Sequence, residues 1–433
     1  MSSKKIRPRL VFADTSGNIY DHPDLLMLSR QGYAMALPRP DELMPLPEAS
    51  DLFLLPGRRA MGLDPETGRV EVLDKGEVAV AAFAAPAHTA AGVCSFHSED
   101  NAPCLPLFSY CAVGFDKGRF YVNAKKVDQD IRQVFAGIPQ KKIDRGARGL
   151  LHDLPDNRLA QHLAHCALTY CCPAAKNLAL GRYEAPLPTS TACNAACVGC
   201  ISHQAAEAGF TPPQERIRFT PTPKEIVQVM LRHGAREDRP VYSFGQGCEG
   251  EPLTQAGVIA EAVASFRAKD GSGTVNINTN GSLPLTIPDL ARAGVNSLRV
   301  SLVSAREPLY TAYHRPKSYS FGDVLDCIKA AKAHNMFVSL NFLYFPGIGD
   351  CEEELEALSG LVNAYNVNYI QLRNLNMDPE LFLDLAKIAP VGPSTGLVNF
   401  RKRIKKSRPG LGLGYFNPFL DEAGRPAPYL PTT

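Results

Sequence analysis

The segment Cys193-Asn194-Ala195-Ala196-Cys197-Val198-Gly199-Cys200 places three cysteines on one short stretch, in the spacing CxxxCxxC. Cysteine thiolates are the usual ligands of iron–sulfur clusters, and a cubane cluster held by three cysteines keeps one iron open to another ligand. The alternative is a structural zinc site, which normally needs four closed ligands, with His203 as the candidate for the fourth. The spacing and the small residues of the loop favour the cluster.

Strand-like and helix-like segments alternate on the carboxyl side of this triplet. The strand-like segments are Val241–Phe244, Thr274–Asn278, Ser297–Leu302, Phe337–Tyr344 and Tyr369–Leu372, and the helix-like segments are Lys224–His233, Gln255–Ala268, Phe321–His334 and Glu352–Tyr365. Such alternation is typical of βαβ units around a parallel sheet. With a short first strand before Cys193 the chain has about six units, which predicts an α/β fold with a partial (β/α)6-type barrel core over residues 183–390.

The residues on either side of this core have a different composition. Residues 1–182 are predicted to form a smaller β-rich or α+β domain, with a hairpin turn at Asp64–Gly68 and strands at Val78–Phe83 and Phe120–Asn123. A helix is predicted at Leu159–Tyr170. Residues 391–433 are rich in Gly and Pro, and we expect them to pack on the core as a tail. The basic run at 401–406 is interpreted as a solvated helix face.

Composition excludes several classes of protein. The chain has 433 residues, 45% hydrophobic and 21% charged, with a formal net charge of +2, which argues against bulk attraction to nucleic acid or to a membrane surface. We find no secretory signal and no apolar run long enough to span a bilayer, and therefore expect a cytoplasmic protein. Twelve cysteines in such a chain indicate metal or redox chemistry rather than a disulfide framework.

Polar or Gly-rich residues follow the predicted strands, at the ends where β/α barrels place functional groups. They are the segment 245–252 (Gly-Gln-Gly-Cys-Glu-Gly-Glu-Pro), Thr279-Asn280-Gly281, Ser301, Ser304, Asn341 and Gln371–Asn376. Glycines allow close approach of the backbone, and exposed carbonyls accept hydrogen bonds from an ammonium group. We expect a concave pocket here, with substrate contacts from Glu249, Arg373, Asn374 and Asn376.

These segments resemble motifs of the radical S-adenosylmethionine (SAM) superfamily, most specifically through the cysteine triplet. Segment 245–252 is similar to the family's Gly-Gly-Glu-Pro motif, with Glu249 in the place of the first glycine. Thr279-Asn280-Gly281 and Pro346–Asp350 are similar to two further family segments. One departure is Gly199, since the family usually has an aromatic residue just before the third cysteine. As a whole, the chain resembles a bacterial branch of the superfamily.

The resemblance implies two cofactors, a 4Fe–4S cluster on Cys193, Cys197 and Cys200, and SAM on the open iron. In the family the reduced cluster cleaves SAM to methionine and a 5′-deoxyadenosyl radical, which abstracts hydrogen from the substrate. The three cysteines are therefore the predicted catalytic and metal-binding residues. The residues predicted to contact SAM are Gly250, Glu251, Asn280, Ser301, Arg315 and Asn341. Arg315 is assigned to the SAM carboxylate, because a guanidinium is a forked donor.

We expect a small-molecule or peptide substrate and an electron donor such as flavodoxin or ferredoxin. Two alternatives stay open: an RNA-modifying radical SAM enzyme that uses the basic tail, and a zinc-stabilised binding protein. Cys166, Cys171 and Cys172 cluster upstream of the triplet, which indicates either a second iron–sulfur site or, for Cys166, a small buried hydrophobe. Cys248 is interpreted as structural, although it lies near the predicted pocket.

Overall fold

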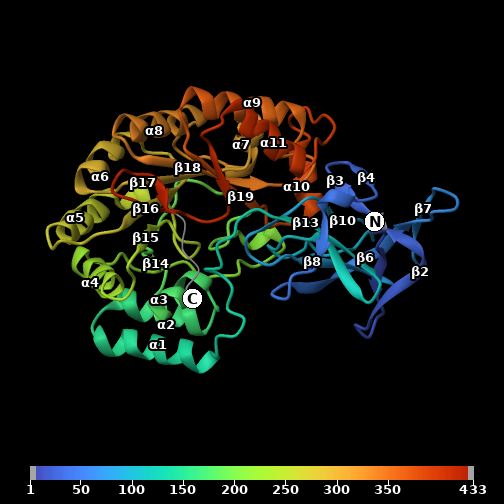
Figure 1. The fold of residues 1–433 in the computed structure, drawn as a ribbon, viewed down its shortest axis with the longest axis horizontal. Coiled ribbons are helices and arrows are strands. Elements are labelled where there is room, and N and C mark those ends of the chain that lie inside the picture. The colour runs from blue at the N-terminus through green and yellow to red at the C-terminus, as the bar shows by residue number, and fades with distance from the viewer. Residues whose placement is uncertain (1–5, 428–433) are drawn as a thin grey trace, which may run out of the picture.

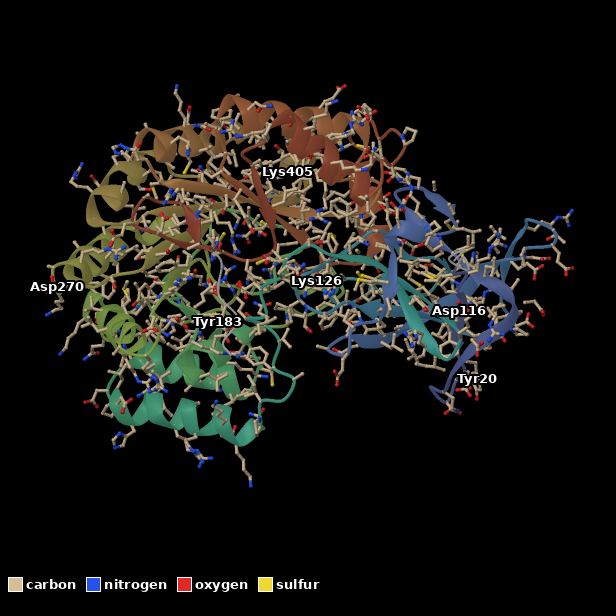
Figure 2. The ribbon with its side chains drawn as sticks, in the orientation of Figure 1. Tyr20, Asp116, Lys126, Tyr183, Asp270 and Lys405 are labelled. Carbon is tan, nitrogen blue, oxygen red and sulfur yellow. The ribbon has the colours of Figure 1, made fainter. Side chains whose placement is uncertain are left out.

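A computed structural model describes residues 6–427 of the chain. In Figure 1 a β-rich region built from the first third of the chain lies beside a curved parallel sheet covered by helices. Figure 2 shows Lys126 between these two parts, and Tyr20 and Asp116 on the outer side of the β-rich region. Among the described residues, no helix is both long and apolar enough to cross a membrane.

The parallel sheet confirms the predicted partial barrel. Its strands are β14 (Glu184–Pro186), β15 (Val241–Phe244), β16 (Thr274–Thr279), β17 (Ser297–Leu302), β18 (Phe337–Tyr344), β19 (Tyr369–Asn374) and β20 (Gly412–Gly414). They pair in chain order, and every pairing is parallel. Within the part of the chain that the structure describes, β14 and β20 are not paired with each other, so the sheet is a half-barrel.

Helices cover the outer face of this sheet (Figure 1). They are α4 (Pro223–Gly234), α5 (Ala256–Arg267), α6 (Ile287–Ala293), α7 (Glu307–His314), α8 (Phe321–Ala333), α9 (Glu352–Ala364), α10 (Pro379–Ala386) and α11 (Leu397–Ser407). Helix α4 begins at a capping box, in which Thr222 and Glu225 satisfy each other's backbone N–H groups. Most of these helices bury apolar side chains against the strands in one continuous core.

The C-terminal residues contribute a helix and a strand to this core. Helix α11 buries Leu397, Phe400 and Ile404, and β20 extends the sheet beyond β19. The short hairpin of β21 (Phe419–Leu420) and β22 (Pro426–Ala427) follows. The basic run 401–406 lies on α11, where Arg403 forms an ion pair with Glu352 of α9. The polar face of this helix is thus partly engaged within the chain itself.

The β-rich region is formed by one large, mainly antiparallel sheet. Its strands are β1 (Arg9–Ala13), β2 (Ile19–Met27), β3 (Ser29–Gln31), β4 (Ala34–Ala36), β5 (Leu43–Pro45), β6 (Asp51–Leu63), β7 (Val70–Val72), β8 (Val78–Phe83), β9 (His88–Ala90), β10 (Val93–Cys94), β11 (Phe96–Ser98), β12 (Cys111–Asp116) and β13 (Arg119–Lys126). The predicted turn at Asp64–Gly68 joins β6 to β7, with Asp64 N donating to the Arg69 carbonyl at 2.9 Å.

Three helices follow the β-rich region in the sequence and pack on the half-barrel. They are α1 (Gln140–Asp153), α2 (Arg158–Leu168) and α3 (Pro173–Leu180). Leu150, Leu159 and Leu178 are buried in the same core as the parallel strands. In Figure 1 these helices lie below β14 and α4, away from the β-rich sheet. The sequence alone grouped them with residues 1–182, because chain order does not reveal which apolar face a helix covers.

The β-rich region is hydrogen-bonded to the end of β19. Thr89 Oγ1 donates to the Leu372 carbonyl at 2.6 Å, and the side chain of Asn374 accepts from Ala90 N and donates to the His88 carbonyl. A buried ion pair of 2.8 Å between Arg58 and Asp378 lies at the same junction. The polar carboxyl end of β19 is therefore used partly to hold β9 in place.

Candidate functional site

A cavity of about 390 Å³ opens at the carboxyl ends of the parallel strands. Its lining includes twelve of the thirteen residues that the sequence selects: Cys193, Cys197, Cys200, Glu249, Gly250, Glu251, Asn280, Ser301, Asn341, Arg373, Asn374 and Asn376. The thirteenth, Arg315, is absent from it. This volume suits a ligand of small-molecule size. Residues from nearly 200 positions of sequence meet here because parallel strands all end at the same edge of a sheet.

The cysteine loop is held against the carboxyl end of α7. Val198 N donates to the Tyr313 carbonyl at 3.0 Å, and Lys317 N donates to the Asn194 carbonyl at 2.9 Å. Ala195 forms an antiparallel bridge with Pro316. These backbone bonds fix a loop that has no regular structure of its own, so the three cysteines have a defined place at the cavity.

The three sulfurs have the character of ligands for a group larger than a single ion. They do not all lie within 4.8 Å of one another, as the ligands of one zinc ion would, and His203 is exposed. Burial, reinforced by the neighbouring thiols, raises the pKa of Cys197, and burial raises that of Cys193. A bound cationic centre would favour all three thiolates. The donor set therefore fits a cubane cluster better than zinc.

Three side chains surround the sulfurs without being evident from the sequence. His314 Nδ1 lies 3.4 Å from Cys197 Sγ, and burial lowers the pKa of His314 to about 3, so its ring is neutral. Arg216 Nη2 donates to Cys200 Sγ at 3.7 Å and Arg216 Nε donates to Ser202 at 3.2 Å. The third is Tyr313, which lies next to Gly199.

Gly199 lies so close to Tyr313 that a side chain at position 199 would force the buried Tyr313 ring to shift. A Cβ atom at position 199 would be 2.5 Å from the Tyr313 hydroxyl oxygen, and Tyr313 is buried while lining the cavity. The aromatic residue that the family places before the third cysteine is thus absent from the loop, and an aromatic ring from α7 occupies the adjacent space. Glycine at position 199 therefore leaves the space that the Tyr313 side chain occupies.

Segment 245–252 packs tightly on its neighbours, through Gly250 on the start of the cysteine loop and through Gly245 on β16. A Cβ atom at Gly250 would be 1.9 Å from the Ala192 carbonyl oxygen, and one at Gly245, where φ is +76°, would be 1.8 Å from the Asn278 carbonyl oxygen. Gly250 N donates to the Ser190 carbonyl at 2.8 Å. Only glycine permits this approach, so the wall of the cavity is set by the backbone.

Two buried carboxylates brace the same wall. Glu249 accepts from the backbone N–H groups of Thr189, Ser190 and Gln246 at 2.7 to 2.9 Å. Glu251 accepts from Leu253 N and Asn280 N and from the Thr279 hydroxyl. Burial raises the pKa of each to about 7, although these hydrogen bonds oppose the shift. The oxygens of Glu249 are occupied by the loop, so its geometry is that of a brace.

Asparagines link the wall to the neighbouring strands. Asn280 Nδ2 donates to Asn194 Oδ1 at 2.8 Å, joining the end of β16 to the cysteine loop. On β18, Asn341 Oδ1 is buried at the cavity without a hydrogen-bond partner among the described residues. An unpaired buried acceptor is costly, and a ligand donor in the cavity would satisfy it. Ser301, at the end of β17, lies on the same lining.

Two arginines also line the cavity. Arg373 stacks on Tyr415, with its guanidinium carbon 4.2 Å from the ring centre, and donates to the Tyr415 carbonyl at 3.3 Å. Arg299, on β17, donates to Gln371 at 2.8 Å, and its Nε is buried and unpaired. Burial and the charge of Arg373 lower the pKa of Arg299 to about 9. Neither guanidinium forms an ion pair with a described carboxylate.

For two of the predicted site residues, the structure differs from the role that the sequence predicts. Arg315 ends α7 in the left-handed conformation, at a φ of 46°, and its side chain is exposed outside the cavity lining. Its neighbour His314 lines the cavity instead. Asn374 lines the cavity, but its amide oxygen and its amide nitrogen each already form one hydrogen bond with β9.

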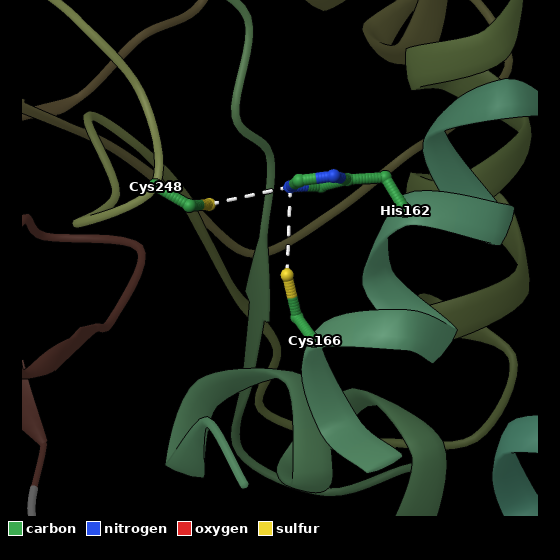
Figure 3. Close-up of side chains that lie close together, drawn as sticks. All are labelled: His162, Cys166 and Cys248. Carbon is green, nitrogen blue, oxygen red and sulfur yellow. Dashed lines mark hydrogen bonds between the residues drawn. The ribbon is translucent and has the colours of Figure 1, made fainter. Parts of the chain in front are cut away.

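The upstream cysteines are grouped differently in space than in the sequence. Cys171 is exposed and Cys172 immediately precedes α3, whereas Cys166 lies beside His162 and the distant Cys248 (Figure 3). Hydrogen bonds from Cys248 and His162 lower the pKa of Cys166 to about 5. A helix brings Cys166 and His162 together, but only the tertiary fold adds Cys248.

Comparison with known proteins places this site in a family. Residues 187–358 match the model of the radical SAM superfamily. No curated protein sequence matches the chain. Solved structures to which the chain is similar include HydG, a maturase of the FeFe hydrogenase, at 14% identity over 64% of this chain and 72% of that one, with a TM-score of 0.35.

Two further structures have the same level of similarity. A radical SAM methyltransferase from Sphaerobacter thermophilus is 16% identical over 54% of this chain and 66% of that one, with a TM-score of 0.37. Methylornithine synthase, PylB, is 15% identical over 63% of this chain and 84% of that one, with a TM-score of 0.35. The radical SAM superfamily uses a 4Fe–4S cluster and SAM. Residues 187–358 are therefore a radical SAM domain, and the chain is an enzyme.

Proposed function

We propose that Cys193, Cys197 and Cys200 hold the 4Fe–4S cluster of this enzyme, and that the cavity beside them binds SAM and an anionic small molecule or peptide. The observation that carries the proposal is the placement of three cysteines on one fixed loop at the cavity, where they do not form a compact single-ion group. When bound, the cluster and SAM supply reductive cleavage of SAM and hydrogen abstraction from a substrate.

The chain's own residues bind and orient these groups. The Gly-rich wall at 245–252 brings backbone close to the cysteine loop, and Asn341 Oδ1 offers an unused acceptor inside the cavity. Ser301 and Asn280 add hydroxyl and amide groups along the lining. Glu249 and Glu251 keep this wall in place through buried hydrogen bonds. We assign SAM to this side of the cavity, next to the cysteines.

Two guanidinium groups on the cavity lining support an anionic substrate. Arg299 and Arg373 form no ion pair with a described carboxylate, although Glu184 on the same lining attracts Arg299, and the mutual repulsion of the two arginines contributes to the lowered pKa of Arg299. A carboxylate or phosphate between them would relieve this repulsion and match the forked geometry of each group. The reductant is assigned to the class of small electron-transfer proteins such as flavodoxin or ferredoxin.

The proposal is tested with anaerobically reconstituted protein. We expect about four irons per chain and slow conversion of SAM to 5′-deoxyadenosine after reduction with dithionite, measured by chromatography. A variant with Cys193, Cys197 and Cys200 all replaced by Ala is the control, and it should lose both the cluster absorbance and the product. Full iron content in that variant, or no deoxyadenosine from a fully loaded and reduced wild-type protein, would contradict the proposal.

A further inference from the structure

His162, Cys166 and Cys248 converge outside the cavity. His162 and Cys166 lie one turn apart on α2, and Cys248 comes from the loop after β15. His162 Nε2 is 3.4 Å from Cys248 Sγ and 3.5 Å from Cys166 Sγ, and all three ligand atoms lie within 4.8 Å of one another. Figure 3 shows the single ring nitrogen facing both sulfurs.

Hydrogen bonds can join these groups in pairs, because Cys248 is also hydrogen-bonded to Cys166, and the same convergence suits one shared metal ion. A neutral imidazole nitrogen either donates one proton or accepts through one lone pair, so Nε2 satisfies one thiol and not two. A tetrahedral zinc ion at the usual bond lengths would separate a ligating sulfur and nitrogen by about 3.6 Å. The two separations of 3.4 and 3.5 Å are close to that value. Both nitrogen–sulfur separations, and the limit of 4.8 Å on the third separation, are thus compatible with one shared ion.

The surroundings have the character of a built site. Cys166 and Cys248 are buried, at 3% and 6% exposure, in a small apolar cluster with Ala167 and Ala175. The His162 ring packs edge-on to Phe219. The backbone near Cys248 is also fixed, because Ile217 N donates to its carbonyl at 2.7 Å. An apolar shell of this kind limits solvent access and strengthens thiolate–metal bonding.

We propose that His162, Cys166 and Cys248 form a zinc(II) site, with the fourth position taken by water. Imidazole and two thiolates are a donor set that zinc favours over harder cations. The ion would connect α2 to loop 245–252, whose next residues, Glu249, Gly250 and Glu251, form the wall of the cavity. Its role is to position that wall, and it is separate from the cluster on the cysteine triplet.

The test measures zinc on the full chain with the triplet removed, so that only this site contributes. In the Cys193, Cys197 and Cys200 to Ala background we expect about one zinc per chain in competition with a chromogenic chelator. Cobalt(II) should give the visible bands of a tetrahedral site and a thiolate charge-transfer band. Adding Cys166→Ala, Cys248→Ala or His162→Ala should weaken zinc binding by more than roughly 100-fold. Loss of a residue that only hydrogen-bonds to a metal ligand typically costs roughly 10- to 100-fold, and loss of a ligand itself should cost more.

Two control variants isolate the site from other cysteines. Cys171→Ala removes an exposed thiol from the same stretch, and Cys327→Ala removes a buried thiol from α8; both should retain zinc. If the triplet background does not fold, iron and zinc are measured together in reconstituted protein, where Cys166→Ala should lose zinc and keep iron. Unchanged zinc in Cys166→Ala, zinc absent from protein with an intact site, or a Cys166–Cys248 disulfide in anaerobic protein would each overturn the proposal.

Discussion

Cysteines meet at two places that share loop 245–252, and the two places are built in opposite ways. At the cavity the sulfurs are spread around a space of about 390 Å³ lined with unpaired polar atoms. At the site of His162, Cys166 and Cys248 the ligand atoms lie within 4.8 Å of one another, in an apolar shell. The first has room for groups of many atoms, and the second for one ion.

The difference shows how one loop serves two purposes. Cys248 and Glu249 are adjacent, yet Cys248 contacts α2 while Glu249 accepts hydrogen bonds from the segment before the cysteine triplet. The cavity depends on the backbone of loop 245–252, which lies close to the cysteine loop and must stay fixed there. The compact site is positioned to provide that rigidity, because it joins the loop to a helix packed on the core.

The largest expected effect is at Arg373, and it distinguishes the part of the cavity assigned to the substrate from the part assigned to SAM. Arg373→Ala should reduce substrate-stimulated deoxyadenosine formation by about 2–5 kcal/mol in kcat/KM, because an anion would lose its forked partner. Iron, zinc, SAM affinity and unstimulated SAM cleavage should not change. The measurement screens carboxylates and phosphates for stimulation of deoxyadenosine formation. Arg373→Lys is the matched variant, because it keeps the positive charge and lacks the forked guanidinium donors. Loss of SAM binding in Arg373→Ala would instead place the cofactor in the same part of the cavity as Arg373.

The next effect concerns the cysteine loop alone. Gly199→Phe should destabilise the protein by about 1–3 kcal/mol and lower its iron content, since the new side chain overlaps Tyr313. Zinc should be retained. The double variant Gly199→Phe/Tyr313→Ala should recover iron, because it restores one aromatic ring to the same space, and Tyr313→Ala alone is its control. Equal iron loss in the single and double variants would show that the two positions are independent.

A smaller effect tests the loop that the two sites share. Glu249→Gln should lower the free energy of unfolding by about 1–2 kcal/mol, because an amide N–H₂ group would face a backbone donor. The pKa of Glu249 is raised from its ordinary 4.5 to about 7, so the folded protein binds more protons between these values. Stability from this group therefore falls as pH rises from 4.5 to 7 and is level above pH 7.

Chemical denaturation across this pH range measures both parts of that prediction. The decrease in stability between pH 4.5 and pH 7 should be smaller in Glu249→Gln. Part of the decrease should remain, because burial raises the pKa of Glu251 in the same way. Weaker zinc binding in this variant would show that the shared loop couples the two sites. Unchanged stability would mean that Glu249 is free for a substrate, as its position in the sequence predicts.

The smallest effect is expected at Arg315. Because its side chain is exposed outside the cavity, Arg315→Ala should change stability by less than about 0.5 kcal/mol and leave SAM affinity unaltered. Equilibrium binding of SAM to the reconstituted protein is the measurement. A marked loss of affinity would restore the assignment of this residue to the SAM carboxylate and would extend the open site beyond its present lining.

Local patterns predicted the sheet and the open site well. β15, β17 and β18 have the bounds that the sequence predicts, β15 and β18 from nearly continuous apolar runs and β17 from alternating apolar residues. The cysteine triplet was evident because its ligands are neighbours in sequence. β20 was not predicted, because Gly412-Leu413-Gly414 has little strand propensity and is a strand only through pairing with β19.

The residues that sequence reasoning missed depend on the tertiary fold. Arg299 lies within an ordinary half-buried strand and Tyr313 on an ordinary helix, so neither is marked by its neighbours. His162 and Cys248 are 86 positions apart, and no spacing rule connects them. One signal was available: His162 and Cys166 are four residues apart on a predicted helix, which places both on one face.

The late position of β20 in the chain has a consequence for how the enzyme is assembled in the cell. Phe416 and Asn417 line the cavity, and Leu420 N donates to Thr274 at the start of β16. These residues leave the ribosome after every strand of the half-barrel, because synthesis runs from the amino terminus. The cysteine loop is made more than 200 residues earlier. On the proposed assignment of the cluster to this triplet, iron and sulfur therefore reach a complete cavity only after translation, and the nascent chain must keep the three thiols reduced until then.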